Sequence, residues 1–89
     1  MATRNTIEIN TTPKNVVASE TDGSELVGYN AGSETIYISD AASAPNPITR
    51  TTGAFAYLPG EYLVLTVVSG EGSWAWTARG VSHLVLADK

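Results

Sequence analysis

Residues 53–76 read Gly-Ala-Phe-Ala-Tyr-Leu-Pro-Gly-Glu-Tyr-Leu-Val-Leu-Thr-Val-Val-Ser-Gly-Glu-Gly-Ser-Trp-Ala-Trp and concentrate the large apolar side chains of the protein. They include both tryptophans, two of the four tyrosines and the only phenylalanine. Pro59 and Gly60 separate two short apolar runs, and the turn at residues 69–72 precedes a third. Short runs of Val, Leu, Tyr and Trp between Gly and Pro are typical of β-strands, whereas a buried helix would need a longer uninterrupted window.

Alternating apolar and polar residues predict further short strands on both sides of this stretch. The expected strands cover residues 6–10, 15–18, 24–30, 34–39, 48–52, 54–58, 62–68, 73–78 and 81–87. Turn residues separate these runs, and no apolar run follows a helical period. Seven to nine short strands at this spacing predict an all-β fold, either an antiparallel β-sandwich or a small barrel.

The length of 89 residues is that of a single domain. We expect residues 24–89 to form the sandwich or barrel. Residues 1–23 are polar, and a short strand within them places Ile7 and Ile9 on one face. This N-terminal segment is interpreted either as an edge strand of the same domain or as an arm that reaches onto a neighbour.

Three connections carry specific predictions. Residues 30–33, Asn-Ala-Gly-Ser, are expected to turn because Asn and Gly tolerate positive φ. Pro59 and Gly60 suit the middle of a type II turn, which does not match the twist of a tight hairpin and therefore indicates a corner between two sheets. Residues 79–80 are expected to close a hairpin that places Trp76 opposite His83 and Trp74 opposite Val85.

Composition argues against several classes of function. Nine acidic residues against five basic ones give a net charge of −4, which disfavours nucleic acids and anionic membranes as partners. No signal-peptide h-region is visible, and no apolar run is long enough to span a membrane. His83 is the only histidine, cysteine is absent and the acidic residues are scattered. We therefore expect no catalytic, cofactor or metal site and no enzymatic activity.

Four aromatic residues are the candidates for a protein interface: Tyr57, Tyr62, Trp74 and Trp76. Trp74 and Trp76 are two residues apart, so they share one face of a strand. If they are buried they belong to the core. If they are exposed, they form either a contact with a protein partner or a stacking platform for a sugar.

The strand at residues 62–68 is apolar on both faces, with Leu63, Leu65 and Val67 opposite Tyr62, Val64 and Val68. Such a strand is either central in a sandwich with a covered outer face or part of a subunit contact. A chain this small, with no disulfide, also buries limited surface by itself. We therefore expect self-association, with a trimer as the first expectation.

Several motifs together resemble the small all-β structural proteins of tailed-bacteriophage virions, particularly head decoration (cement) proteins and related neck or fibre-base modules. The resemblance covers about residues 26–87. It lies in the motifs Gly-Tyr-Asn-Ala-Gly-Ser at 28–33, Glu-Thr-Ile-Tyr-Ile at 34–38, Gly-Ala-Phe-Ala-Tyr-Leu-Pro-Gly-Glu at 53–61 and Leu-Val-Leu at 63–65, and in the strand that contains Trp74. It implies a non-enzymatic protein that binds a major capsid protein or another virion protein. It also implies a location on the capsid surface after synthesis in the host cytoplasm.

A second reading keeps the same fold but changes the function. A carbohydrate-binding or adhesion module of a tail or fibre would use Trp74 and Trp76 as its stacking platform. Co-sedimentation with empty shells would favour the decoration protein, whereas binding to an array of glycans would favour the adhesion module.

Overall fold

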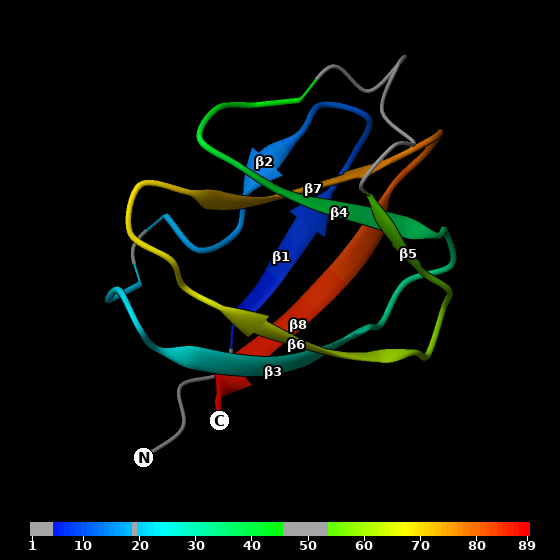
Figure 1. Ribbon diagram of the computed structural model, residues 1–89. Helices are drawn as coiled ribbons and strands as arrows, with labels where there is room; N and C mark the ends of the chain where they lie inside the picture. Colours follow the sequence, from blue (N-terminus) through cyan, green and yellow to red (C-terminus); the bar gives the residue numbers. More distant parts are fainter. Residues whose placement is uncertain (1–4, 19, 46–53) are drawn as a thin grey trace.

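The computed structural model describes residues 5–18, 20–45 and 54–89, and in these ranges the chain forms eight β-strands and no helix (Figure 1). The strands are β1 (Asn5–Ile9), β2 (Lys14–Asn15), β3 (Glu25–Asn30), β4 (Ile36–Ala41), β5 (Phe55–Tyr57), β6 (Tyr62–Thr66), β7 (Gly72–Thr77) and β8 (Ser82–Asp88). The predicted all-β fold is confirmed. The strand expected over residues 48–52 lies outside the described residues.

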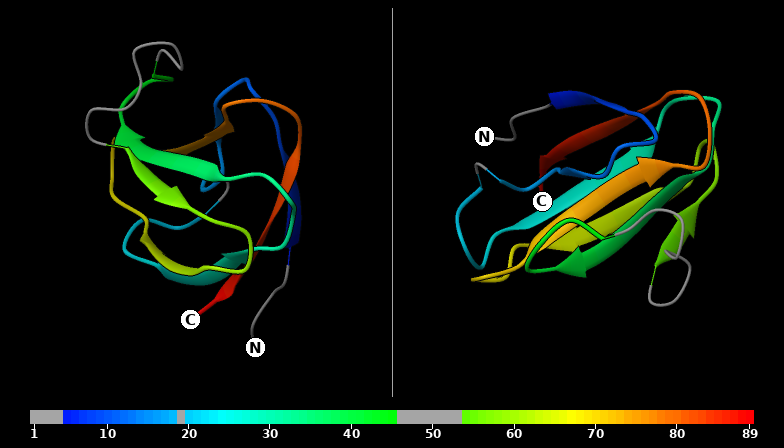
Figure 2. Two further views of the ribbon diagram at one scale, coloured as in Figure 1. Left: turned by 90° about the vertical axis from the view of Figure 1, so that its right-hand side faces the viewer. Right: turned by 90° about the horizontal axis from the view of Figure 1, so that it is seen from above.

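The strands form two antiparallel four-stranded sheets that face each other, as the two views in Figure 2 show. Sheet A has the order β1-β8-β3-β6, and sheet B has the order β2-β7-β4-β5. Four of the pairings join β1 with β8, β2 with β7, β3 with β6 and β4 with β5. The chain therefore folds back on itself as one long hairpin that is wrapped across two layers. This is the topology of a jelly roll, so the molecule is a sandwich rather than a barrel.

The predicted corner at Pro59 and Gly60 is confirmed. It joins β5 in sheet B to β6 in sheet A. The Glu61 backbone N–H donates to the Leu58 carbonyl at 3.0 Å, and Gly60 has a φ of 86°. A proline at the first central position and a positive-φ glycine at the second are what a type II turn requires.

The predicted hairpin between residues 73–78 and 81–87 is wrong. β7 pairs with β4 and β2, whereas β8 pairs with β1 and β3 in the other sheet. Trp76 lies opposite Tyr37, and Val85 lies opposite Tyr29. β7 contributes Ala75 to the core and β8 contributes Leu84 and Leu86, so placing the two strands in facing sheets lets both of them cover the same core. The alternation of side chains along each strand is the same whether the two strands pair with each other or lie in different sheets. The sequence pattern therefore could not distinguish these two arrangements.

The N-terminal segment belongs to the same sandwich within the described residues. β1 pairs with β8 at one edge of sheet A. Ile9 is fully buried, and Val16 and Val17 lie in the core beside it. Within the described residues, β1 is thus an edge strand of sheet A.

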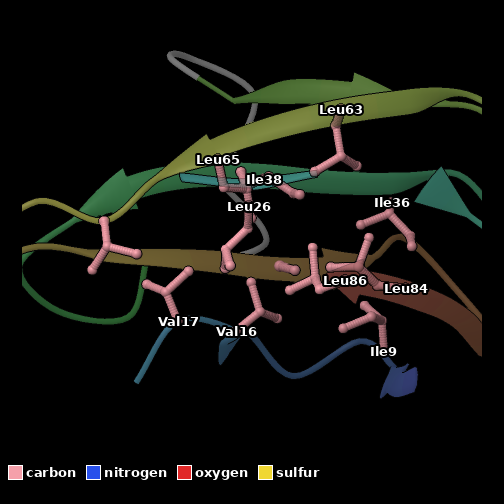
Figure 3. Packing of buried hydrophobic residues seen from close by; sticks show 12 residues of the cluster. Ile9, Val16, Val17, Leu26, Ile36, Ile38, Leu63, Leu65, Leu84 and Leu86 are labelled. Carbon is pink, nitrogen blue, oxygen red and sulfur yellow. The ribbon is translucent and has the colours of Figure 1, made fainter. Parts of the chain in front are cut away.

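The core lies between the two layers, where apolar side chains from both sheets meet (Figure 3). Alternate residues of each strand point inward, as the burial of Leu63, Leu65 and Val67 after the exposed Tyr62 illustrates. The members of the core are Ile9, Val16, Val17, Leu26, Ile36, Ile38, Leu63, Leu65, Val67, Ala75, Leu84 and Leu86. The face predicted for each residue of the strand at 62–68 is therefore confirmed.

One polar residue, Asn30 at the end of β3, is fully buried beside this core. Its Nδ2 donates to the carbonyls of Glu34 at 2.7 Å and Tyr57 at 2.9 Å. Its Oδ1 accepts from the Gly32 backbone N–H at 3.1 Å and from the Ser82 hydroxyl at 2.7 Å. This one side chain therefore bonds to segments before β4, in β5 and in β8.

The backbone of Asn30 adds a fifth and a sixth hydrogen bond. Its N–H donates to the Glu61 carbonyl at 3.0 Å, and its carbonyl accepts from the Gly60 N–H at 2.7 Å. Asn30 thereby holds the corner between β5 and β6 as well. A fully paired amide is the form in which a polar group can be buried at little cost.

The reason given for a turn at residues 30–33 is wrong, because neither Asn30 nor Gly32 has a positive φ. Gly32 is needed for a different reason. A Cβ at this position would collide with the Ser82 hydroxyl and lie 2.6 Å from the His83 backbone nitrogen. Glycine is therefore required for close approach to β8.

We expect Asn30→Ala to lower the free energy of unfolding by about 2–3 kcal/mol, because the buried Ser82 hydroxyl and two partly buried carbonyls lose their partner. Chemical denaturation measures this loss. Asn10→Ala is the matched control, since the hydrogen bond that the Asn10 side chain accepts from the Thr12 N–H is exposed. Its expected effect is within about 0.5 kcal/mol. Equal losses in both variants would contradict a central role for Asn30.

Candidate protein-binding surface

The outer face of sheet A is apolar over three neighbouring strands. Register places Tyr29 between Val85 and Tyr62, and it places Val27 between Ala87 and Val64. These residues point outward because β3, β6 and β8 use their alternate residues for the core. We call this surface the apolar face, formed by Val27, Tyr29, Tyr62, Val64, Val85 and Ala87.

The apolar face is exposed most strongly on β6. Tyr62 is 81% exposed and Val64 is 53% exposed. The ring of Tyr62 leans against Tyr29, with ring centroids 5.5 Å apart and planes at 47°. Two shallow hollows of about 420 Å³ each lie on either side of Tyr62, both floored in part by Gly28. Protruding aromatic rings beside shallow hollows are typical of surfaces that bind protein.

Polar groups border this face. Lys89 and Glu25 form an exposed ion pair at 3.4 Å at one end. Glu8 and His83 lie opposite each other between β1 and β8 on the far side. An apolar centre with a polar rim is the usual anatomy of a protein–protein interface.

Among the described strands, β6 also forms one edge of sheet A. On its paired side, the Val67 N–H donates to Ser24 and the Glu61 carbonyl accepts from Asn30. Since backbone groups alternate between the two sides of a strand, those of Tyr62, Val64 and Thr66 point away from β3. They are thus available to a further strand. An edge position also excludes the interpretation of this strand as central.

Of the four predicted interface residues, Tyr62 alone lies on the apolar face. Trp74 and Trp76 share a face, as predicted, but it is the outer side of sheet B, in the opposite layer. Trp76 is 1% exposed and stacks on Tyr37, with ring centroids 6.2 Å apart. The Trp74 Nε1 donates to the Ala41 carbonyl at 2.9 Å. In this structure Trp76 therefore has no surface on which a sugar could stack, whereas Trp74 is only partly buried.

Tyr57 lies on β5, at the edge of sheet B, and is partly buried against the core. Desolvation raises the pKa of its hydroxyl, and the negative charges of Asp40 and Glu61 raise it further. Tyr57 and Tyr62 line the same hollow beside β6, whereas Trp74 and Trp76 lie on β7 in sheet B. The structure therefore brings the four candidates together as two pairs and not as one surface.

Ser82 and His83 are adjacent in sequence but point to opposite sides of β8. Ser82 is buried and bonded to Asn30, whereas His83 is exposed on the outer face. Within the described ranges, no three His, Cys, Asp or Glu side chains are grouped so that they could hold a metal ion. The same residues include no helix long and apolar enough to cross a membrane.

The sequence prediction missed most of the apolar face. Alternation places Val27 and Tyr29 on one side of their strand, and Tyr62 and Val64 on one side of theirs, but nothing in the sequence indicates that the two strands are neighbours. Val85 is predicted to lie opposite Trp74, but it pairs with Tyr29 in sheet A, while Trp74 pairs with Ser39 in sheet B. The available signal was the presence of apolar residues on both faces of several strands, which is unusual for an antiparallel sheet with one wet face.

Comparison of the chain with protein-family models, with curated proteins and with solved structures gives no match.

The different positions of Tyr62 and Trp76 predict different effects on stability. Trp76→Ala should lower the free energy of unfolding by about 3–5 kcal/mol, because it empties a buried site. Tyr62→Ala should cost at most about 1 kcal/mol, which is the usual value of an aromatic pair. Thermal denaturation of both variants measures the contrast. A larger loss for Tyr62→Ala than for Trp76→Ala would contradict the assignment of core and surface.

The raised pKa of Tyr57 predicts a loss of stability in alkali. Above about pH 10 the unfolded state releases the tyrosine proton before the folded state does. The free energy of unfolding therefore falls as the pH rises through this region up to the folded pKa. Tyr57→Phe should remove that part of the slope in denaturation experiments. Identical slopes for the two proteins would show that the pKa is not raised.

Proposed function

We propose that this chain is a structural protein of a tailed-bacteriophage virion, a capsid decoration (cement) protein that binds the assembled head shell and stabilises it. The observation that carries the proposal is the apolar face beside the bare β6 edge. A solvent-exposed apolar sheet face with an open edge is a liability for a free domain unless a partner covers it.

Two further observations support the same function. The motifs at residues 28–38 and 53–65 resemble those of small virion proteins. The jelly-roll topology is also one that viral capsid domains use, although a fold by itself does not establish a function. A protein that binds only the assembled shell would stabilise that form by mass action.

The proposed partner is a major capsid protein or another virion protein, and the site of action is the capsid surface. Self-association, with a trimer as the first expectation, belongs to the same proposal. Copies that meet on a lattice would cover surface that the small core of one chain leaves exposed. Sedimentation of the free protein over a range of concentrations measures this association.

We expect Tyr62→Ala to weaken binding to empty head shells at least about thirtyfold, which corresponds to a hot-spot loss of about 2 kcal/mol. Co-sedimentation with the shells measures the affinity. Val81→Ala is the matched control, because Val81 is also exposed but lies in the turn between β7 and β8. Wild-type protein that does not sediment with the shells would refute the proposed function. Equal binding by Tyr62→Ala and Val81→Ala would refute the role of the apolar face.

A further inference from the structure

The two sheets leave a groove open along one side of the sandwich, between β5 and β6. Both strands are edges, since β5 ends sheet B and β6 ends sheet A on this side. The groove has a volume of about 210 Å³. Its lining consists of Ile38, Asp40, Phe55, Tyr57, Val64, Leu65, Thr66 and Val68.

The groove reaches the apolar core. Ile38 and Leu65 are core residues and form part of its lining. Phe55 is 70% exposed and stands at the β5 rim, and Val68 is exposed near the end of β6. A closed apolar cavity of about 150 Å³ accepts a benzene molecule. The groove therefore has room for one large apolar side chain, which would cover core atoms that are now near solvent.

The rim of the groove is suited to an extended backbone. The amide groups of Val64 and Thr66 point away from β3 into the space beside β6. A peptide in the β conformation could pair with them and add a fifth strand to sheet A. This mode of recognition uses backbone hydrogen bonds for affinity and pockets for alternate side chains for specificity.

The charge around the groove selects the occupant. Asp40 is part of the lining, and Glu61 lies close enough to act on the same Tyr57 hydroxyl. Among the described residues, no lysine or arginine lines the groove. A second copy would bring the same carboxylates and its own net charge of −4 to the contact. Charge complementarity therefore favours a partner segment that carries a cation.

We propose that the groove between β5 and β6 binds an extended segment of a partner protein, which inserts one apolar side chain between the sheets and places a lysine or arginine beside Asp40. The inference deepens the proposed function by naming the chemistry of the partner segment, and it rests on that function only for the identity of the partner. Peptide binding can be measured without any shell.

The probe is the peptide acetyl-Ser-Thr-Ile-Thr-Lys-Thr-Ser-amide, whose Ile and Lys share one face of a strand. One matched peptide replaces the Lys with Glu, and another replaces the Ile with Ser. We expect the Lys peptide to bind about fivefold more tightly than the Glu peptide, as one exposed charge pair allows. The Ser peptide should bind at least about tenfold more weakly, because it has no apolar side chain to bury.

Backbone NMR locates the bound peptide. Shift changes should concentrate on β5 and β6, and the Val64 and Thr66 amides should exchange at least about tenfold more slowly with the Lys peptide bound. Asp40→Asn should abolish the preference for Lys over Glu. The matched control is Glu8→Gln, which removes one negative charge at β1, the opposite edge of sheet A, and should keep the preference.

Several results would overturn the inference: no binding of the Lys peptide at about 1 mM, equal affinity for the Lys and Glu peptides, or shift changes confined to the apolar face. Slowed exchange at Val64 and Thr66 that depends on protein concentration without peptide would identify a second copy as the occupant instead. Shell binding without peptide binding would leave the proposed function standing without the groove. Peptide binding without shell binding would refute the proposed function alone.

Discussion

The hydrogen bonds of Asn30 are the interaction on which the two-layer arrangement depends. A jelly roll crosses repeatedly between its sheets, so the crossings need polar anchors as well as an apolar core. The Asn30 side chain is bonded to the carbonyl of Tyr57 in sheet B and to the hydroxyl of Ser82 in sheet A. Its backbone holds the corner at Gly60. The Asn30 amide and the Ser82 hydroxyl are buried and paired, so the hydroxyl would be left without a partner if the amide were removed, which costs more than the net value of one hydrogen bond.

The same corner determines where the sandwich stays open. Gly60 and Glu61 are held against the end of β3, so β6 runs along β3 and leaves its other side bare. The short β5 follows β4 in the facing layer and leaves a second bare edge. The open edges of β5 and β6, and the groove between them, therefore result from the hydrogen-bonded corner that joins these two strands. A rigid rim of this kind presents backbone groups to a partner without the cost of ordering a loop.

The two outer faces of the sandwich differ in chemistry. Sheet B stacks Tyr37 on Trp76, and this tryptophan is almost completely buried. Sheet A instead exposes Tyr62 over a surface of valine and alanine. Trp76 thus contributes to stability, whereas Tyr62, in contact with Tyr29 and with aliphatic neighbours, dominates the outer surface of sheet A.

The sequence by itself determined the all-β class, most strand positions, which residues of a strand share a face and the corner at Pro59, because period-two alternation and turn chemistry are local properties. Tertiary structure decided which strands are neighbours. It placed Trp74 and Val85 in different sheets and brought the residues of the apolar face together around Tyr62. It also placed Asn30, which the sequence predicted as a turn residue, in a buried position where its side chain bonds to other strands. Alternation is identical whether consecutive strands pair or cross between sheets. The choice between these arrangements comes from burying both apolar faces at once, a long-range packing constraint that no local pattern records.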